Sequence, residues 1–255
     1  MPQIIYHPAV LFLILIVLFS IAASLGAIVL HRLSPLSEDA RENFNVVQGA
    51  TLTLLALLIG FTLSMAVSRY DQRKNFEEEE ANAIGTEYVR ADLLGPTSAA
   101  ATRILLKQYL QLRIDCYRTR DRSELDSINR KTIKIQDQLW NEASERALAE
   151  PNPVTALAVA GMNDVLNTQG YTQAAWSNRI PLSAWALMIL IAFFSNLMQG
   201  YGVRASSGRR VLLFVLPFTV SLSLGLIADI DSPRGGLIRV APVNLISLQQ
   251  SLSSE

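Results

Sequence analysis

Four long runs of uncharged, mostly apolar residues alternate with charged stretches along the chain. An α-helix needs roughly 20 residues to cross the hydrocarbon core of a bilayer, and runs of about this length cover residues 9–30, 48–68, 180–200 and 211–229. Between the second and third runs, residues 69–178 combine helical periodicity with mixed charges. The pattern predicts an all-α fold: a four-transmembrane-helix membrane protein with a helical extramembrane region at 69–178, in a single domain over residues 1–255.

The second run continues into charged sequence without a proline or a glycine-rich turn. We therefore expect one long helix that leaves the membrane and stops at Gly95-Pro96. Four consecutive glutamates, residues 77–80, lie on this helix, and a charge run of this kind is typical of a solvated helix face. Arg69, Arg73, Glu77 and Glu80 are expected to lie along one stripe just outside the membrane, and we expect some of these charges to pair within the helix or with a neighbouring helix. Exposed pairs of this sort contribute only a few tenths of a kcal/mol each.

Capping side chains and prolines predict where the other extramembrane helices begin. Asn152 is followed by Pro153, which suits the first position of a helix. The polar, Ser- and Gln-rich tail after Val240 has the composition of a loosely ordered terminus. The expected caps are Ser37, for a short interfacial helix before the second run, and then Thr97 or Ser98, Ser123 and Asn152.

Small residues recur at three- and four-residue steps through the second run. Such a face lets another helix approach closely in lipid. This face predicts either plain helix packing or a pore or oligomer face, and the hydroxyl groups of Thr62, Ser64 and Ser68 suit the second interpretation. The small-residue face consists of Gly49, Thr53, Ala56, Gly60 and Ser64.

The composition agrees with a multi-pass protein of the cell inner (plasma) membrane. Half of the 255 residues are hydrophobic, 17% are charged and the mean hydropathy is +0.27, whereas a soluble domain has roughly a quarter charged residues. The formal net charge is zero, which argues against nucleic acid as a partner and leaves the lipid bilayer as the expected one. Lys and Arg near the four runs divide almost evenly between the two sides, so they do not orient the protein.

Motifs for catalysis are missing from the sequence, which contains no HExxH, CxxC, GxSxG, P-loop or GxGxxG pattern in a usable context. We therefore expect neither an enzyme nor a cofactor or metal site. Asp229 and Asp231 follow the fourth run at the membrane edge, where an ionised group is costly without a partner. They are expected to face a cation or an arginine.

Two segments resemble the bacterial bestrophin-like membrane proteins, a family with a domain of unknown function. They are GFTLSMAVSRYDQRKNFEEEEANAIGTEYVRADLL, which begins within the second run and extends beyond it, and LIADIDSPRGGLIRV at the end of the fourth. The resemblance implies a juxtamembrane motif and an acidic exit turn as candidate sites. The motif comprises Arg69, Tyr70, Arg73, Glu79, Glu80 and Asn82, and the turn comprises Asp229, Asp231, Pro233 and Gly235.

More distantly, these segments resemble the corresponding parts of true bestrophins, which are pentameric ion channels whose second helices line a narrow hydrophobic neck. The resemblance implies a homo-oligomeric ion channel that interacts with ions. The alternative is a non-conducting membrane scaffold or sensor whose helical region binds a protein partner. The residues implied at the neck are Leu58, Phe61, Thr62 or Met65, with Gly60 and Ser64 as helix-packing candidates.

Overall fold

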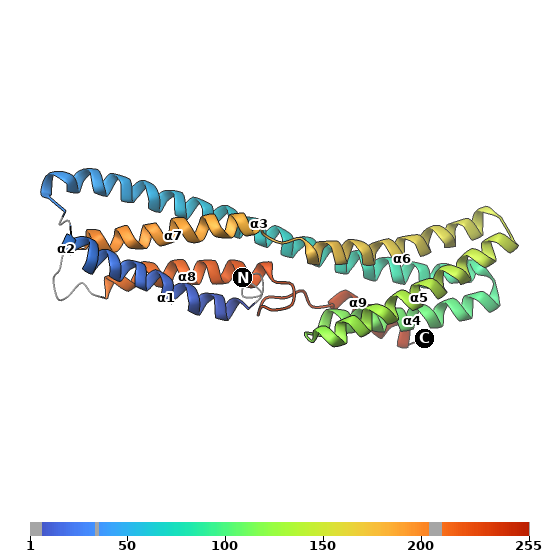
Figure 1. The fold of residues 1–255 in the computed structure, drawn as a ribbon. Helices are drawn as coiled ribbons and strands as arrows, with labels where there is room; N and C mark the ends of the chain where they lie inside the picture. The colour runs from blue at the N-terminus through green and yellow to red at the C-terminus, as the bar shows by residue number, and fades with distance from the viewer. Residues whose placement is uncertain (1–6, 34–35, 204–210, 255) are drawn as a thin grey trace. The chain divides into compact units, whose positions relative to one another are not determined.

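The computed structural model describes residues 7–33, 36–203 and 211–254, and these residues form helices and connecting turns without a β-strand. Four helical stretches are long and apolar enough to cross a membrane. The predicted all-α, four-span fold is therefore confirmed. The helices are α1 (Pro8–Leu25), η2 (Gly26–Leu30), α2 (His31–Leu33), α3 (Glu38–Arg90), η3 (Ala91–Leu94), α4 (Pro96–Arg118), α5 (Arg122–Ala149), α6 (Pro153–Ser177), α7 (Leu182–Gly202), α8 (Leu212–Asp231) and α9 (Val243–Ser253) (Figure 1).

The long helix predicted from the second run exists as α3 and is longer than expected. It begins at Glu38, where the Ser37 hydroxyl accepts a hydrogen bond from the Ala40 amide at 3.3 Å. Ser37 thus caps α3 itself, and the separate interfacial helix expected there is wrong. The physical reason is that neither glycine nor proline interrupts residues 38–48, so the helix continues into the second run.

Gly95 ends the helical stretch as predicted, with φ at 83°, in the left-handed region that favours glycine. Pro96 is already the first residue of α4, so the caps expected at Thr97 or Ser98 are wrong. Asp121, two residues before Ser123, caps α5 by accepting a hydrogen bond from the Glu124 amide.

The cap predicted at Asn152 is confirmed. Its side-chain oxygen accepts hydrogen bonds from the amides of Val154 and Thr155 at 2.8 and 2.9 Å. The Thr155 hydroxyl in turn accepts from the Asn152 amide, which completes a capping box, and Pro153 occupies the first helical position.

The chain folds into two compact units. The first unit comprises Met1–Arg69 and Arg179–Arg239, and the second comprises Tyr70–Asn178 and Val240–Glu255. Helix α3 contributes residues to both units, because the boundary between Arg69 and Tyr70 falls within it.

Close backbone contact joins α1 and η2 to α7 in the first unit (Figure 1). A Cβ added to Gly200 would collide with the Ala23 carbonyl oxygen, and one added to Gly26 would collide with the Leu197 carbonyl oxygen. Contacts of this kind are how small residues bring helices together in lipid, where apolar burial supplies no driving force. Within the chain, Gly26 and Gly200 allow this close approach, and they lie on other spans than the predicted small-residue face.

The contacts at the two ends of the first unit show that α3, α7 and α8 alternate in direction, and α1 runs in the same direction as α7 (Figure 1). At one end, Gln48 near the start of α3 donates a hydrogen bond to Gln199 near the end of α7. At the other end, Arg69 and the amide of Ile180, just before α7, both donate to Asp231 at the end of α8. This up-and-down order is the one that four membrane crossings require.

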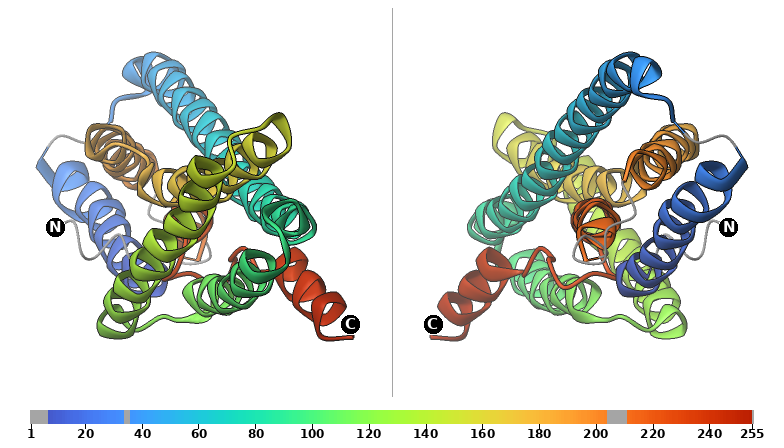
Figure 2. Two further views of the ribbon diagram at one scale, coloured as in Figure 1. Left: turned by 90° about the vertical axis from the view of Figure 1, so that its right-hand side faces the viewer. Right: turned by 90° about the vertical axis from the view of Figure 1, so that its left-hand side faces the viewer.

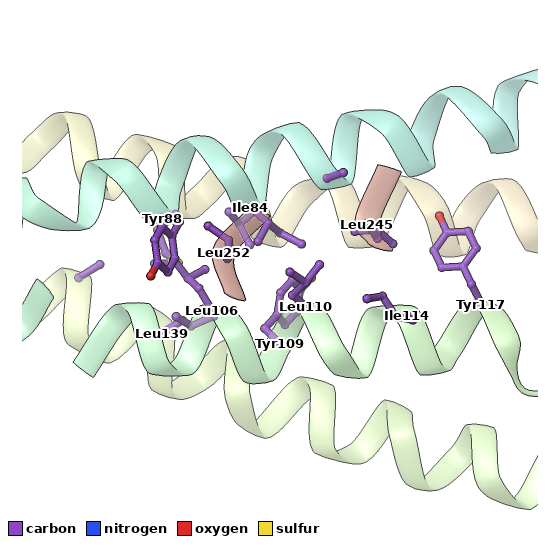
Figure 3. Packing of buried hydrophobic residues seen from close by; sticks show 14 of the residues in the cluster. Ile84, Tyr88, Leu106, Tyr109, Leu110, Ile114, Tyr117, Leu139, Leu245 and Leu252 are labelled. Carbon is purple, nitrogen blue, oxygen red and sulfur yellow. The ribbon is translucent and has the colours of Figure 1, made fainter. Parts of the chain in front are cut away.

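The second unit packs α4, α5, α6, α9 and the second part of α3 around an apolar core. Helix α9 lies beside α4 in both views of Figure 2, and Lys107 Nζ donates to the Leu252 carbonyl at 2.7 Å. The tail after Val240 is therefore helical, and the expectation of loose order is wrong, because Leu245 and Leu252 are buried in the core. Figure 3 shows core residues from α3, α4, α5 and α9, namely Ile84, Tyr88, Leu106, Tyr109, Leu110, Ile114, Tyr117, Leu139, Leu245 and Leu252.

Candidate functional site

The membrane part of α3 is attached to its own unit along a single stripe. Among residues 48–68 only Leu55, Thr62 and Ala66 are buried, and their spacing of seven and four residues places them on one side of the helix. Thr62, a predicted neck residue, is thus buried within the chain, and its hydroxyl donates to the Leu58 carbonyl at 2.7 Å. Leu58 is half-buried beside this stripe.

Half-buried residues border this stripe, and the far side of the helix is exposed and divides into two arcs at about 100° per residue. One arc carries small residues, and a Cβ added to Gly60 would have no neighbour within 4 Å among the described residues. The other arc carries large apolar side chains, and Phe61 is 65% exposed. The small arc contains Gly49, Thr53, Ala56, Gly60 and Ser64, with the larger Val67 at its end, and the large arc contains Leu54, Leu57, Phe61 and Met65, with the smaller Ala50 and Ser68 at the two ends of the span.

The acidic exit turn after α8 holds its two aspartates in different ways. Asp231 is buried and pairs with Arg69, with 3.4 Å between Oδ1 and Nη1, and it also accepts from the Ile180 amide. The expectation of an arginine partner is thus confirmed for Asp231. Asp229 instead accepts from the amides of Leu237 and Ile238, each at 2.8 Å, and so closes the turn onto the chain that follows it.

Pro233 and Gly235 lie in this turn, and the Gly235 amide donates to the Ser232 hydroxyl at 3.0 Å. The position where the chain approaches most closely is the neighbouring Gly236. A Cβ there would lie 2.6 Å from the Asp229 carbonyl oxygen and 2.8 Å from its Oδ1. Only glycine therefore fits beside Asp229, and this residue was missed because its role depends on where the turn folds back.

The charges on the second part of α3 differ from the sequence expectation. Arg73, Glu77, Glu80 and Glu87 are all buried, whereas Glu78, Glu79 and Asn82 are exposed and Tyr70 is half-buried. The expectation of a wholly solvated charge run is therefore wrong. The signal was the spacing of three, four and seven residues, which places the buried charges in phase with buried Ile84 on one helix face.

Glu80 is the centre of a buried polar network in the second unit. Its carboxylate accepts hydrogen bonds from the Arg113 guanidinium of α4, the Tyr117 hydroxyl at 3.5 Å and the Thr172 hydroxyl of α6 at 3.3 Å. Burial disfavours the charged guanidinium, but the adjacent Glu80 outweighs this and raises the pKa of Arg113. The network fixes α4 and α6 to α3.

Glu77 fixes the C-terminal helix to the same helix face. Its carboxylate oxygens accept from the Leu245 amide at 3.0 Å and from Asn244 Nδ2 at 2.6 Å, in the first turn of α9. An acidic group is favoured at a helix N-terminus, where backbone amides lack partners. Burial raises the pKa of Glu77, while these hydrogen bonds oppose that change.

Some residues of the juxtamembrane motif are thus buried and pack against other helices, and the others lie at the surface. Among the residues that the structure describes, no group of three or more His, Cys, Asp or Glu side chains could hold a metal ion. The most open part of the candidate site is the membrane surface of α3. Fold and site together define a four-span helical membrane protein whose second span is incompletely covered by the described part of the chain.

The family follows from comparison with known proteins. The model of the Bestrophin-like domain matches residues 17–245, so the chain belongs to the bestrophin-like family. None of the curated proteins matches the chain in sequence.

Solved structures show the same fold at low sequence identity. One crystal structure of a bacterial Bestrophin homolog from Klebsiella pneumoniae, a mutant, is similar with a TM-score of 0.69 and 14% identity, over 95% of this chain and 96% of that chain. Another structure of that homolog has a TM-score of 0.66 and 15% identity, over 96% of each chain. The resemblance stated from the two sequence segments is thereby confirmed over nearly the whole chain.

Proposed function

We propose that the protein is a homo-oligomeric ion channel of bestrophin-like type, with the membrane part of α3 lining the pore. The observation that carries this proposal is the single buried stripe of α3, Leu55, Thr62 and Ala66, beside two open arcs of different character. A span that faced lipid alone would need no such division, because acyl chains contact large apolar side chains equally well all round the helix.

The two arcs suit two different neighbours in a ring of subunits. Gly60 and Ser64 allow close approach by a helix of the adjacent copy, since small residues let backbones come together in lipid. Phe61 and Met65 then face the axis and form a hydrophobic constriction of the kind that gates by dewetting. Family membership supports this arrangement, because bestrophins use their second helix in this way.

Phe61 gives the direct test of conduction. The purified full chain is reconstituted into liposomes, and ion flux is followed under a salt gradient for the wild type and Phe61→Ala. Widening a hydrophobic constriction should raise the flux several-fold while the oligomer mass stays unchanged. A stable oligomer that shows no flux in either form would reject the channel and support a non-conducting scaffold or sensor.

Gly60 gives the test of assembly. Gly60→Leu should lower the oligomer mass measured by light scattering in detergent, because a bulky side chain separates the adjacent copies. The matched control is Ala186→Leu, at an exposed small residue of α7, which should leave the mass unchanged. A wild-type protein that is monomeric in detergent and in lipid nanodiscs would contradict the proposal.

We also propose that both termini and residues 69–178 lie in the cytoplasm. The alternating spans of the first unit support a common side for these segments. We assign that side to the cytoplasm, in line with the predicted location in the inner membrane. Reporter fusions at Ser123 and at the C-terminus should both report the cytoplasm. Opposite sides for these two fusions would contradict the four-span topology.

A further inference from the structure

Glu87 is a buried carboxylate in the second unit that the Glu80 network does not use. Its side chain is fully buried, with 0% exposed, and neither carboxylate oxygen has a hydrogen-bond partner in the described part of the chain. A buried ionised group without hydrogen bonds is strongly unfavourable. Glu87 therefore differs from Glu77 and Glu80 on the same face, whose carboxylates each accept two or more hydrogen bonds.

The contact between α3 and α6 explains why Glu87 is so enclosed. A Cβ added to Gly161 of α6 would collide with Glu87 Oε2 and would lie 2.6 Å from Arg90 Nη1. The missing side chain of Gly161 thus lets the carboxyl group lie directly against the backbone of α6. This geometry suits a neutral carboxyl, which needs less solvation than a carboxylate.

Two charged groups face Glu87, and they act in opposite directions. Arg90, one turn further along α3, favours the carboxylate, and Asp164 of α6 disfavours it. Burial is the largest influence and also disfavours the charge, so the pKa of Glu87 is raised to about 8.

We propose that Glu87 is a proton-binding site that links the packing of α3 against α6 to pH. The protonated carboxyl fits beside Gly161, and loss of the proton places an unsatisfied charge at this contact and loosens it. Glu87 lies on the helix that also carries the predicted pore residues. The inference concerns helix packing in the second unit and does not depend on conduction.

The sign of the effect follows from proton linkage. An unfolded chain releases the Glu87 proton near the ordinary glutamate value, whereas the folded protein keeps it until about pH 8. Between these values the folded state binds more protons, so stability falls as pH rises. The contribution of Glu87 to stability is fully present at acidic pH and is lost as the pH rises through about 8.

The experiment compares the thermal unfolding of the full-length protein in detergent with that of Glu87→Gln from about pH 5 to about pH 9. The Tm of the wild type should fall by several degrees relative to Glu87→Gln over this window, because the amide cannot ionise. Glu79→Gln, at an exposed position of the same helix, should follow the wild-type profile. The same profile for the wild type and Glu87→Gln would overturn the proposal.

Hydrogen exchange locates the effect. Amides of α6 around Gly161 should exchange faster in the wild type than in Glu87→Gln at alkaline pH, and equally in both at acidic pH, since the intrinsic rate cancels in the comparison. Equal exchange at every pH would also overturn the proposal. Glu87→Met supplies a second neutral variant, and failure of both neutral variants to fold would show that the packed state needs the charge, which contradicts the proposal.

Discussion

The membrane part of α3 and its part in the second unit differ in which side chains they bury. In its membrane part the helix is uncharged and buries only one stripe, so that Gly60 and Phe61 remain open. In the second unit it buries charged side chains among apolar ones and is part of a closed core. Lipid does not drive apolar side chains inward, whereas water does. An open apolar face is therefore acceptable in the first part, and every buried charge in the second part needs compensation.

The largest effect should come from removing one partner of the buried Glu80–Arg113 pair. Arg113→Met leaves the Glu80 carboxylate buried without its guanidinium, a change that typically costs about 3–5 kcal/mol. We expect a correspondingly large loss of free energy of unfolding, measured by denaturant titration with circular dichroism in detergent.

The double variant Glu80→Gln/Arg113→Met tests the reason for this loss. Without the uncompensated charge it should recover a large part of the stability that Arg113→Met loses. A double variant no more stable than the single one would show that the Arg113 side chain acts through its packing, and the contrast between the two parts of α3 would lose its electrostatic basis.

An intermediate effect is expected where the spans contact one another inside the protomer. Gly200→Leu would force α7 away from the Ala23 backbone, and overpacking of this kind typically costs about 1–3 kcal/mol or more. Gly60→Leu meets open space and should leave the unfolding of the monomer unchanged. Thermal unfolding of the two variants under monomeric detergent conditions checks this difference, and equal losses would contradict the assignment of Gly60 to the outside of the protomer.

The smallest effect is expected at Glu79, the exposed neighbour of Glu80. Glu79→Gln should change the free energy of unfolding by less than about 0.5 kcal/mol, as surface substitutions usually do. The same denaturant titration compares it with Arg113→Met. A loss at Glu79 as large as that at Arg113 would mean that the charge run acts as a whole and not through its buried members.

Local signals predicted the helix framework well. The long helix, the stop at Gly95, the cap at Asn152 and the four spans all follow from runs, breakers and caps that act within a few residues. Leu245, Leu248 and Leu252 also recur at helical spacing and form the side of α9 that packs on the core. The polar composition of the tail pointed to loose order instead. The caps expected at Thr97 or Ser98 failed because Gly95-Pro96 already begins the helix just before them. The helix expected to open at Ser123 does begin there, one residue earlier, with Asp121 as its cap.

By itself the sequence determined that the chain is helical, that it crosses a membrane and that α3 is continuous, since hydropathy and helix breakers act along the chain. Only the tertiary structure decided which charges are buried. Glu80 meets Arg113 and Thr172, and Glu87 meets Gly161, across sequence separations that no local pattern encodes. The same holds for the pairing of Asp231 with Arg69. The environment of a charge depends on which helices pack around it, and this packing arises only when distant segments come together.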